Sequence, residues 1–236
     1  PGTGTTALAD TVRLTAHAVS HGCGGVLVLP PFYYKDVSDA GLFASYSEIV
    51  QRVGATALRI YLYHIPPIAQ VGISLELIGR LLDEYADTIV GLKDSSGDWQ
   101  HTATILKEYP ALATFCGSEE FLLETMRNGG VGSITATGNV NPAGIRKIFE
   151  RWQESDAESL QEGVTRMRRC FEGYAPIPAL KAIAADFYEA PEWCTVRPPL
   201  CALSETEGAA LMAELGQLGF SMAGAPSDSG VSASNA

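Results

Sequence analysis

The chain has 236 residues, of which 46% are hydrophobic and 18% are charged, so it can bury one sizeable core. No apolar run reaches the roughly 20 residues that span a bilayer, and no signal peptide is visible at the N-terminus. The formal net charge of -11 argues against nucleic acid as a main partner, because phosphate binding requires a basic face. We therefore expect a cytoplasmic protein without membrane or nucleic-acid partners.

Short apolar runs typical of strands alternate with helical patterns from the N-terminus onward. The strand-like runs are 24–30, 57–63, 88–93, 112–117 and 131–137. The helical patterns are 7–20, 38–53, 74–85, 99–108 and 119–127. This alternation indicates parallel βα units, and both a doubly wound sheet and an eight-stranded barrel remain possible.

A phosphate loop is absent from these units. No G-x-G-x-x-G follows a strand, and the initial G-T-G-T-T lacks the G-K-[ST] ending, so a nucleotide-dependent enzyme has little support. The first helix has no strand before it. If the fold is a barrel, roughly three strands would precede this chain.

The pattern becomes entirely helical after residue 141, with helices expected at 142–153, 155–173, 177–188 and 204–218. We therefore expect a βα barrel portion over 1–141 and a helical extension over 142–221. The small, polar residues 222–236 predict a disordered tail.

Metal and disulfide sites receive no support from the cysteines and histidines. The five cysteines include no C-x-x-C pair, and reduced thiols are the expected state. His17 and His21 could share a helix face, where a surface pair is far more common than a metal site. We expect no metal and no organic cofactor.

Lys93 ends the apolar run T-I-V-G-L-K and is the first candidate for chemistry. At a strand end in a barrel mouth, a desolvated amine can act as a nucleophile toward carbonyl groups. The alternative is a strand-end lysine whose ammonium reaches solvent or pairs with Asp94. Tyr63 ends the preceding strand and could shuttle protons beside Lys93, or its ring could simply fill the core.

Further polar residues follow other strands. Tyr33 and Tyr34 in P-P-F-Y-Y-K offer phenols near the same mouth. In C-G-S-E-E-F, Ser118, Glu119 and Glu120 follow the fourth run, where carboxylates can accept hydrogen bonds from substrate hydroxyls. They could instead form the acidic first turn of a helix.

Seven motifs occur in order and at suitable spacing: P-P-F-Y-Y-K, Y-H-I-P-P, G-L-K-D-S-S-G-D, C-G-S-E-E, T-A-T-G-N-V-N-P, P-I-P-A-L-K and V-R-P-P-L. Together they resemble the dihydrodipicolinate synthase / N-acetylneuraminate lyase family over about residues 1–202. The resemblance implies a (β/α)8 TIM barrel with a C-terminal helical extension in a homo-oligomer, dimer or tetramer. It also implies class I aldolase chemistry, in which pyruvate or another 2-oxo acid is bound as a Schiff base.

The resemblance also implies roles for individual residues. Lys93 would form the imine and Tyr63 would relay protons. The second relay tyrosine, supplied in some members by a neighbouring subunit, falls on Tyr34 or Tyr33, of which Tyr34 is favoured. Glu119 and Glu120 stand where sugar-acid-cleaving members hold substrate hydroxyls, and the segment 134–138, with Thr135, should line the site from the last strand. Tyr33 and Ser118 are further candidates for substrate binding.

Two departures from the family pattern narrow the expected function. The motif that grips the 2-oxo acid carboxylate lies upstream of the matched region. Ile68 stands where true dihydrodipicolinate synthases have an arginine, which binds the distal carboxylate of the aldehyde partner. An isoleucine cannot pair with a carboxylate. We expect cleavage of a 2-keto-3-deoxy sugar acid to pyruvate and an aldehyde. The alternatives are a sugar acid dehydratase, a condensing synthase and a non-catalytic ligand-binding remnant.

Overall fold

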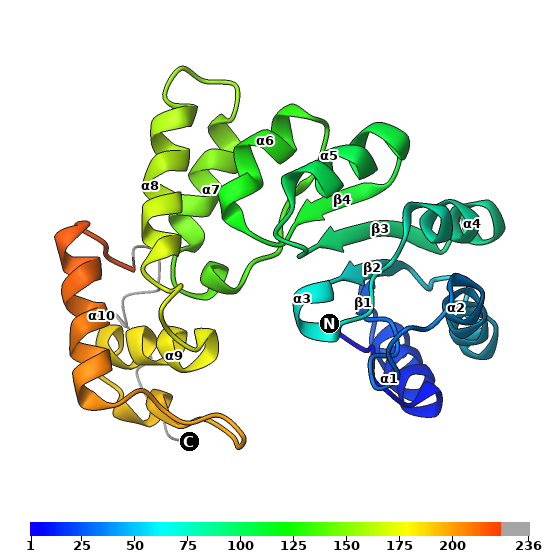
Figure 1. Cartoon of the computed structure of the whole chain (residues 1–236), viewed down its shortest axis with the longest axis horizontal. Helices are drawn as coiled ribbons and strands as arrows, with labels where there is room; N and C mark the ends of the chain where they lie inside the picture. The colour runs from blue at the N-terminus through cyan, green and yellow to red at the C-terminus, as the bar shows by residue number, and fades with distance from the viewer. Residues whose placement is uncertain (223–236) are drawn as a thin grey trace, which may run out of the picture. The chain divides into compact units, whose positions relative to one another are not determined.

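The computed structural model describes residues 1–222, which divide into two compact units that meet in sequence between residues 135 and 136 (Figure 1). In the described chain, the first unit holds a parallel five-stranded sheet in the order β1-β2-β3-β4-β5. The strands are β1 (Val26–Val28), β2 (Ile60–His64), β3 (Ile89–Asp94), β4 (Ala113–Cys116) and β5 (Gly132–Ser133). Each strand pairs with the next in sequence, as expected for consecutive right-handed βα units.

Helices connect the strands of the first unit. They are α1 (Leu8–Ser20), α2 (Asp39–Val53), α3 (Pro66–Ala69), α4 (Leu75–Tyr85), α5 (Trp99–Glu108), η1 (Glu119–Phe121) and α6 (Leu122–Arg127). Ser38 and Ser74 cap α2 and α4, as their positions in the sequence predict, because each hydroxyl accepts a backbone N–H of the first turn. The bounds of α2, α4 and α5 agree with the predicted ranges to within one residue.

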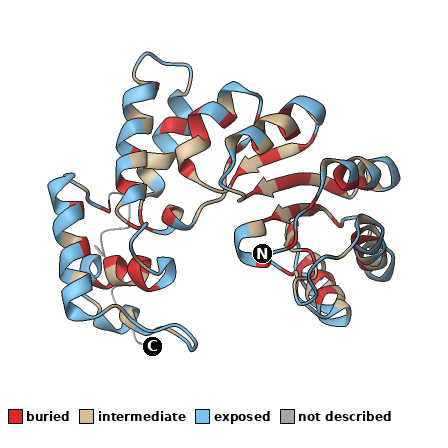
Figure 2. Cartoon of the chain, viewed as in Figure 1, coloured by how far each residue is buried: buried red, intermediate tan, exposed pale blue. Residues whose placement is uncertain are grey.

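One face of the sheet carries the main core. Ile60 and Leu62 of β2 and Leu92 of β3 are fully buried and pack with Leu77 and Leu81 of α4. Figure 2 shows buried residues concentrated along the strands and on the inner sides of these helices. The alternate residues of β2 lie on the opposite face and are only half-buried. This asymmetry gives the sheet one helix-covered face and one open face.

The last strand is shorter than the predicted run 131–137. The ladder continues only as far as the Ile134 N–H, which donates to the Cys116 carbonyl over 3.0 Å. From Ala136 the chain forms the 3-10 helix η2 (Ala136–Asn139). β4 ends at Cys116 and the chain then turns into η1, so no partner strand remains for a longer β5.

The second unit is helical. Its elements after η2 are α7 (Pro142–Arg151), α8 (Ala157–Arg169), α9 (Pro176–Phe187), η3 (Pro191–Cys194) and α10 (Glu205–Gln217). A separate core joins Met167 and Phe171 to Ile183 of α9 and Leu211 of α10. Met222 is buried in this core, and the rest of the predicted tail lies outside the described residues. None of the described helices is both long and apolar enough to cross a membrane.

Candidate active site

Lys93 and Tyr63 meet at the carboxyl ends of two neighbouring strands. β2 and β3 are parallel, and their register places Tyr63 beside Lys93. The Lys93 Nζ donates a hydrogen bond to the Tyr63 Oη over 3.0 Å and lies 4.3 Å from the centre of the Tyr63 ring. Both side chains are half-buried. The structure therefore joins the amine and the phenol that the sequence singles out.

Strand alternation explains why Lys93 does not pair with Asp94. Successive side chains of a strand point to opposite faces, so Tyr63 and Lys93 share the open face while His64 and Asp94 lie on the helix-covered face. The Asp94 carboxylate is buried and takes its hydrogen bonds from the helical side. The pairing of Lys93 with its neighbour, which the sequence left open, does not occur in this structure.

The acidic segment after β4 forms its own contacts. Glu119 is fully buried, and its carboxylate accepts a 2.5 Å hydrogen bond from the Thr135 hydroxyl just after β5. The Ser118 hydroxyl accepts the Glu120 backbone N–H over 3.3 Å and so caps η1. Glu119 and Glu120 thus open a helical turn, which was the alternative to substrate binding. Contact of Ser118, Glu119, Glu120 or Thr135 with a substrate stays a prediction.

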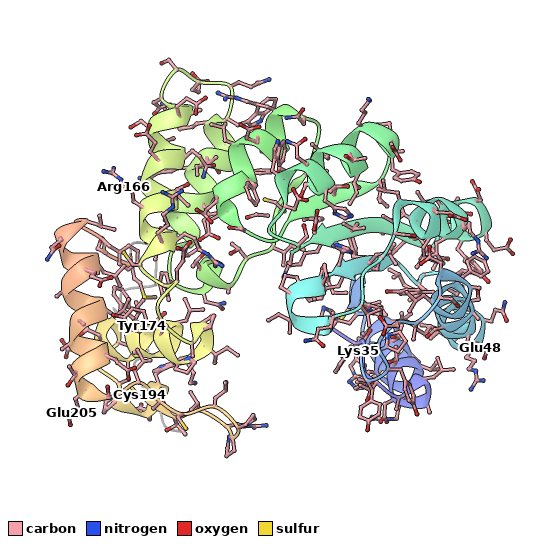
Figure 3. The ribbon with its side chains drawn as sticks, viewed as in Figure 1. Lys35, Glu48, Arg166, Tyr174, Cys194 and Glu205 are labelled. Atoms are coloured by element: carbon pink, nitrogen blue, oxygen red, sulfur yellow. The ribbon has the colours of Figure 1, made fainter. Side chains whose placement is uncertain are left out.

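Tyr33 and Tyr34 lie on an exposed loop after β1. Their side chains are 74% and 75% exposed, and the two rings meet edge to face at 5.2 Å. Lys35, labelled in Figure 3, ties this loop down by donating to the carbonyls of Phe32 and Ala69. Within residues 1–222 the structure gives Tyr34 no hydrogen bond to Tyr63 or Lys93. A relay role for Tyr34 therefore stays a prediction, as does substrate binding by Tyr33.

A polar cluster that sequence reasoning missed lies behind the amine–phenol pair. We call His64, Asp94, His101 and Thr102 the Asp94 cluster. Asp94 accepts hydrogen bonds from the His101 ring (2.9 Å), the Thr102 hydroxyl (2.7 Å) and the Ser96 backbone N–H (2.9 Å). The His64 and His101 rings stack at 4.3 Å with an interplanar angle of 17°. Parallel pairing of β2 with β3 brings these distant positions together.

Burial and hydrogen bonding set the charges in the cluster. Burial lowers the pKa of His64 to about 4, so this ring is neutral at pH 7. Burial alone would raise the pKa of Asp94, but hydrogen bonds from His101, Thr102 and Ser96 outweigh it and hold that pKa below its usual range. The hydrogen bond to Asp94 raises the pKa of His101. Asp94 and His101 therefore form a charge-assisted pair beside a neutral ring.

The donor atoms of His64, Asp94 and His101 lie within 4.8 Å of one another, which is close enough to consider a metal ion. However, the His64 Nδ1 accepts the Ile73 backbone N–H over 3.0 Å, so the neutral ring carries its proton on Nε2 and has no lone pair left. The two stacked rings also keep their in-plane nitrogen lone pairs in separate, nearly parallel planes, which disfavours convergence on one ion. The arrangement fits a closed hydrogen-bond network better than a metal site.

Cysteine chemistry has no support near this site. The five cysteines are unpaired, and Cys116 is buried at the end of β4. Burial raises the pKa of its thiol to about 12, so the nucleophilic thiolate is scarce at neutral pH. Lys93 is the better candidate for a nucleophile at this end of the sheet.

The free energy of unfolding should fall with acid between pH 6.5 and pH 4 because of His64. The unfolded ring has a pKa near 6.5 and the native ring about 4, so the unfolded state binds more protons in this window. A gap of this size corresponds to about 3 kcal/mol lost between pH 7 and pH 4. The pKa of Asp94 is lowered, so its contribution to the free energy of unfolding is lost only at lower pH. The pKa of His101 is raised, so its contribution is instead lost as the pH rises. Asp39 and Asp98 also line the cleft beside these rings.

Urea unfolding of His64→Asn across this pH range checks the prediction. An asparagine Oδ1 can still accept the Ile73 N–H, but it does not titrate. We expect a flatter profile for this variant and an unchanged profile for His17→Gln, whose parent side chain is exposed on α1. A slope in His64→Asn equal to that of the parent would show that His64 is not responsible.

The site and its setting define a class of protein: a parallel βα fold that presents an amine and a phenol at the carboxyl end of its strands, where TIM-barrel enzymes hold their active sites.

Comparisons with known proteins identify the family and the fold. Residues 1–218 match the model of the dihydrodipicolinate synthetase family, and the chain belongs to this family. Its members are carbon–carbon lyases of the class I aldolase type, and so is this chain. The family, fold class and enzyme class expected from the sequence are confirmed.

Individual relatives extend over most of the chain. An uncharacterised DapA-like lyase of Chloroflexus aurantiacus is 36% identical over 213 residues, which cover 90% of this chain and 71% of the relative. Dihydrodipicolinate synthase from Agrobacterium tumefaciens superimposes with a TM-score of 0.84 at 30% identity, covering 92% of this chain and 74% of that one. YagE of Escherichia coli, solved in complex with pyruvate, gives 0.83 at 26% identity, with coverage of 92% and 74%. YagE is named a putative 2-dehydro-3-deoxy-D-gluconate aldolase.

Proposed function

We propose that the chain binds a 2-oxo acid as a Schiff base on Lys93 and cleaves a 2-keto-3-deoxy sugar acid to pyruvate and an aldehyde. The observation that carries this proposal is the 3.0 Å hydrogen bond between the Lys93 Nζ and the Tyr63 Oη at the carboxyl end of the sheet. A phenol at this distance can accept and return the protons that imine formation moves. Membership in a lyase family, with a relative solved in complex with pyruvate, supports the 2-oxo acid as substrate.

The reaction begins when the uncharged Lys93 amine attacks the ketone carbon of the substrate. The resulting carbinolamine loses water, with Tyr63 transferring protons, and gives a protonated imine. This iminium draws electrons from the bond between the third and fourth substrate carbons. As the proton leaves the hydroxyl on the fourth carbon, that bond breaks and the aldehyde departs. Protonation of the remaining enamine and hydrolysis release pyruvate and restore the amine, so the iminium serves as the electron sink.

The residue at position 68 favours a sugar acid substrate over an aldehyde partner that carries a carboxylate of its own. Ile68 lies on α3, five residues after Tyr63, and its side chain is 76% exposed. An aliphatic side chain there offers no cation to a second carboxylate. Ser118, Glu119, Glu120 and Thr135 supply hydroxyl and carboxylate groups after β4 and β5, and such groups suit substrate hydroxyls. The putative assignment of YagE to a keto-deoxy sugar acid points the same way.

The proposal extends to assembly and location. Tyr34 is exposed on its loop, so it could serve as the second relay phenol for a neighbouring copy in a dimer or tetramer. Tyr33 beside it could contact the same substrate. Unpaired cysteines accord with a cytoplasmic location, where thiols stay reduced.

Product analysis tests the proposed reaction. We expect the protein to release pyruvate from 2-keto-3-deoxy-gluconate or a related keto-deoxy acid, measured by coupling to lactate dehydrogenase and NADH. Equal amounts of aldehyde should accumulate. A dehydratase would consume the same acids without releasing pyruvate, so consumption without pyruvate would contradict the proposed cleavage. A protein that neither consumes these acids nor binds pyruvate covalently would favour the non-catalytic alternative.

A further inference from the structure

Each proposed reacting residue is followed along its strand by a member of the Asp94 cluster. Tyr63 precedes His64 on β2, and Lys93 precedes Asp94 on β3. The register pairs Tyr63 with Lys93 and His64 with Asp94. The amine and phenol therefore occupy the open face at the same level at which the cluster occupies the helix-covered face.

The cluster binds the two strand ends to the surrounding elements. Asp94 is 3% exposed and accepts from Ser96 in the following loop and from His101 and Thr102 in the first turns of α5. The Asp94 carbonyl accepts the Gly117 N–H over 2.6 Å, which extends the attachment to the end of β4. The buried carboxylate of Asp94 thus fixes the end of β3 to a loop and a helix, and its backbone carbonyl links it to the end of β4.

His64 makes the corresponding attachments for β2. Its carbonyl accepts the Ser95 N–H over 2.7 Å, its Nδ1 accepts the Ile73 N–H over 3.0 Å, and its ring stacks on His101. The His101 ring thus contacts the ends of both strands, since it donates to Asp94 and stacks on His64. A side chain from α5 thus bridges the two strand ends, whose register is set by the backbone ladder.

The backbone couples this network to the reacting groups. Adjacent residues on a strand are separated by only about 3.3 Å, so a shift of Asp94 or His64 carries Lys93 or Tyr63 with it. Misplacement of a reacting group by roughly 1 Å can reduce a rate by about a hundredfold. No member of the cluster lies on the open face, so its effect on catalysis would be indirect.

We propose that Asp94 and His101 are positioning residues, which hold the Lys93 amine within hydrogen-bond distance of the Tyr63 phenol by fixing the ends of β2 and β3 from the helix-covered face. The expected effect of these residues on catalysis rests on the proposed Schiff-base chemistry. The positioning itself concerns the geometry of the free protein and can be measured without turnover.

The variants Asp94→Asn and His101→Phe remove the charge or the ring N–H donor while keeping similar volume, and His101→Phe keeps an aromatic ring against His64. His101→Asn places an amide N–H near the lost donor and serves as the conservative replacement. Thr104→Val is the matched control, because the Thr104 hydroxyl donates only to the Gln100 carbonyl within α5. Each variant is first checked for folding by near-UV circular dichroism.

The first readout is the rate of borohydride-dependent trapping with saturating pyruvate. We expect Asp94→Asn and His101→Phe to trap at least about tenfold more slowly, with pyruvate affinity changed far less. His101→Asn should recover part of the rate, and Thr104→Val should match the parent. A purely structural role would lower the melting temperature and leave the rate of the folded protein unchanged. Parent-like trapping in both Asp94→Asn and His101→Phe, or an equal loss in Thr104→Val, would overturn the proposal.

The second readout needs no substrate. Competitive labelling with acetic anhydride reports the reactivity of the Lys93 amine relative to Lys107, an exposed lysine of α5, in the same sample. We expect the ratio to change at least threefold in Asp94→Asn and His101→Phe and to stay constant in Thr104→Val. A constant ratio in all variants would overturn the positioning role. If the parent is never trapped by pyruvate, the proposed function fails, and this ratio alone decides the positioning role.

Discussion

Replacing Lys93 with alanine is expected to abolish covalent trapping of pyruvate while leaving the fold intact. Only an amine can form the imine, and Lys93 is the lysine whose Nζ meets a phenol at the carboxyl end of the strands. The side chain is half-buried on the open face rather than in the helix-covered core, so its removal leaves that core unchanged. Intact-protein mass spectrometry after incubation with pyruvate and borohydride measures the result.

Lys107→Ala is the matched control for this substitution. Lys107 lies exposed in the last turn of α5 and is not part of the candidate site. This variant should be trapped at the parental rate. Circular dichroism and melting temperature must show that Lys93→Ala is folded. A folded Lys93→Ala protein that still gains the mass of reduced pyruvate would remove Lys93 from the mechanism.

Replacing Tyr63 with phenylalanine is expected to lower turnover by roughly two or more orders of magnitude, the usual scale for a residue that transfers protons. The substitution removes only the hydroxyl oxygen that accepts the 3.0 Å hydrogen bond from Lys93. The ring stays, so the contact of the Lys93 Nζ with the ring, 4.3 Å from its centre, can persist. Steady-state pyruvate release under saturating substrate measures this effect on kcat.

Tyr61→Phe provides the control. Tyr61 lies two residues earlier on the same open face of β2, and its ring packs edge to face against Phe115 at 6.0 Å. Removing its hydroxyl should leave turnover near the parental value. If Tyr63→Phe also kept the parental kcat, the phenol would have no part in proton transfer, and the short distance to Lys93 would be only a packing contact.

The sequence predicted the elements that local signals define. Ser38 and Ser74 precede helical periods and cap α2 and α4 as expected, and continuous apolar runs mark the strands. Lys93 and Tyr63 could be paired in advance because each ends a buried run and neighbouring parallel strands end at one edge. The family resemblance supplied the remaining barrel geometry and the enzyme class.

The Asp94 cluster could not be found from spacing alone. His64 lies thirty residues before Asp94, and only strand pairing brings the two together. Strand alternation would have supplied the signal, because the residues that follow Tyr63 and Lys93 must share the opposite face. The short α3 was not among the predicted helices. Its start at Pro66 and Pro67 agrees with the preference of proline for the first turn of a helix.

The most direct test of the central claim is to trap the unmodified protein with pyruvate and borohydride, digest it and sequence the modified peptide by mass spectrometry. We predict a single added group on the lysine of G-L-K-D-S-S, which is Lys93. An adduct on any other lysine, or no adduct at saturating pyruvate, would contradict the account.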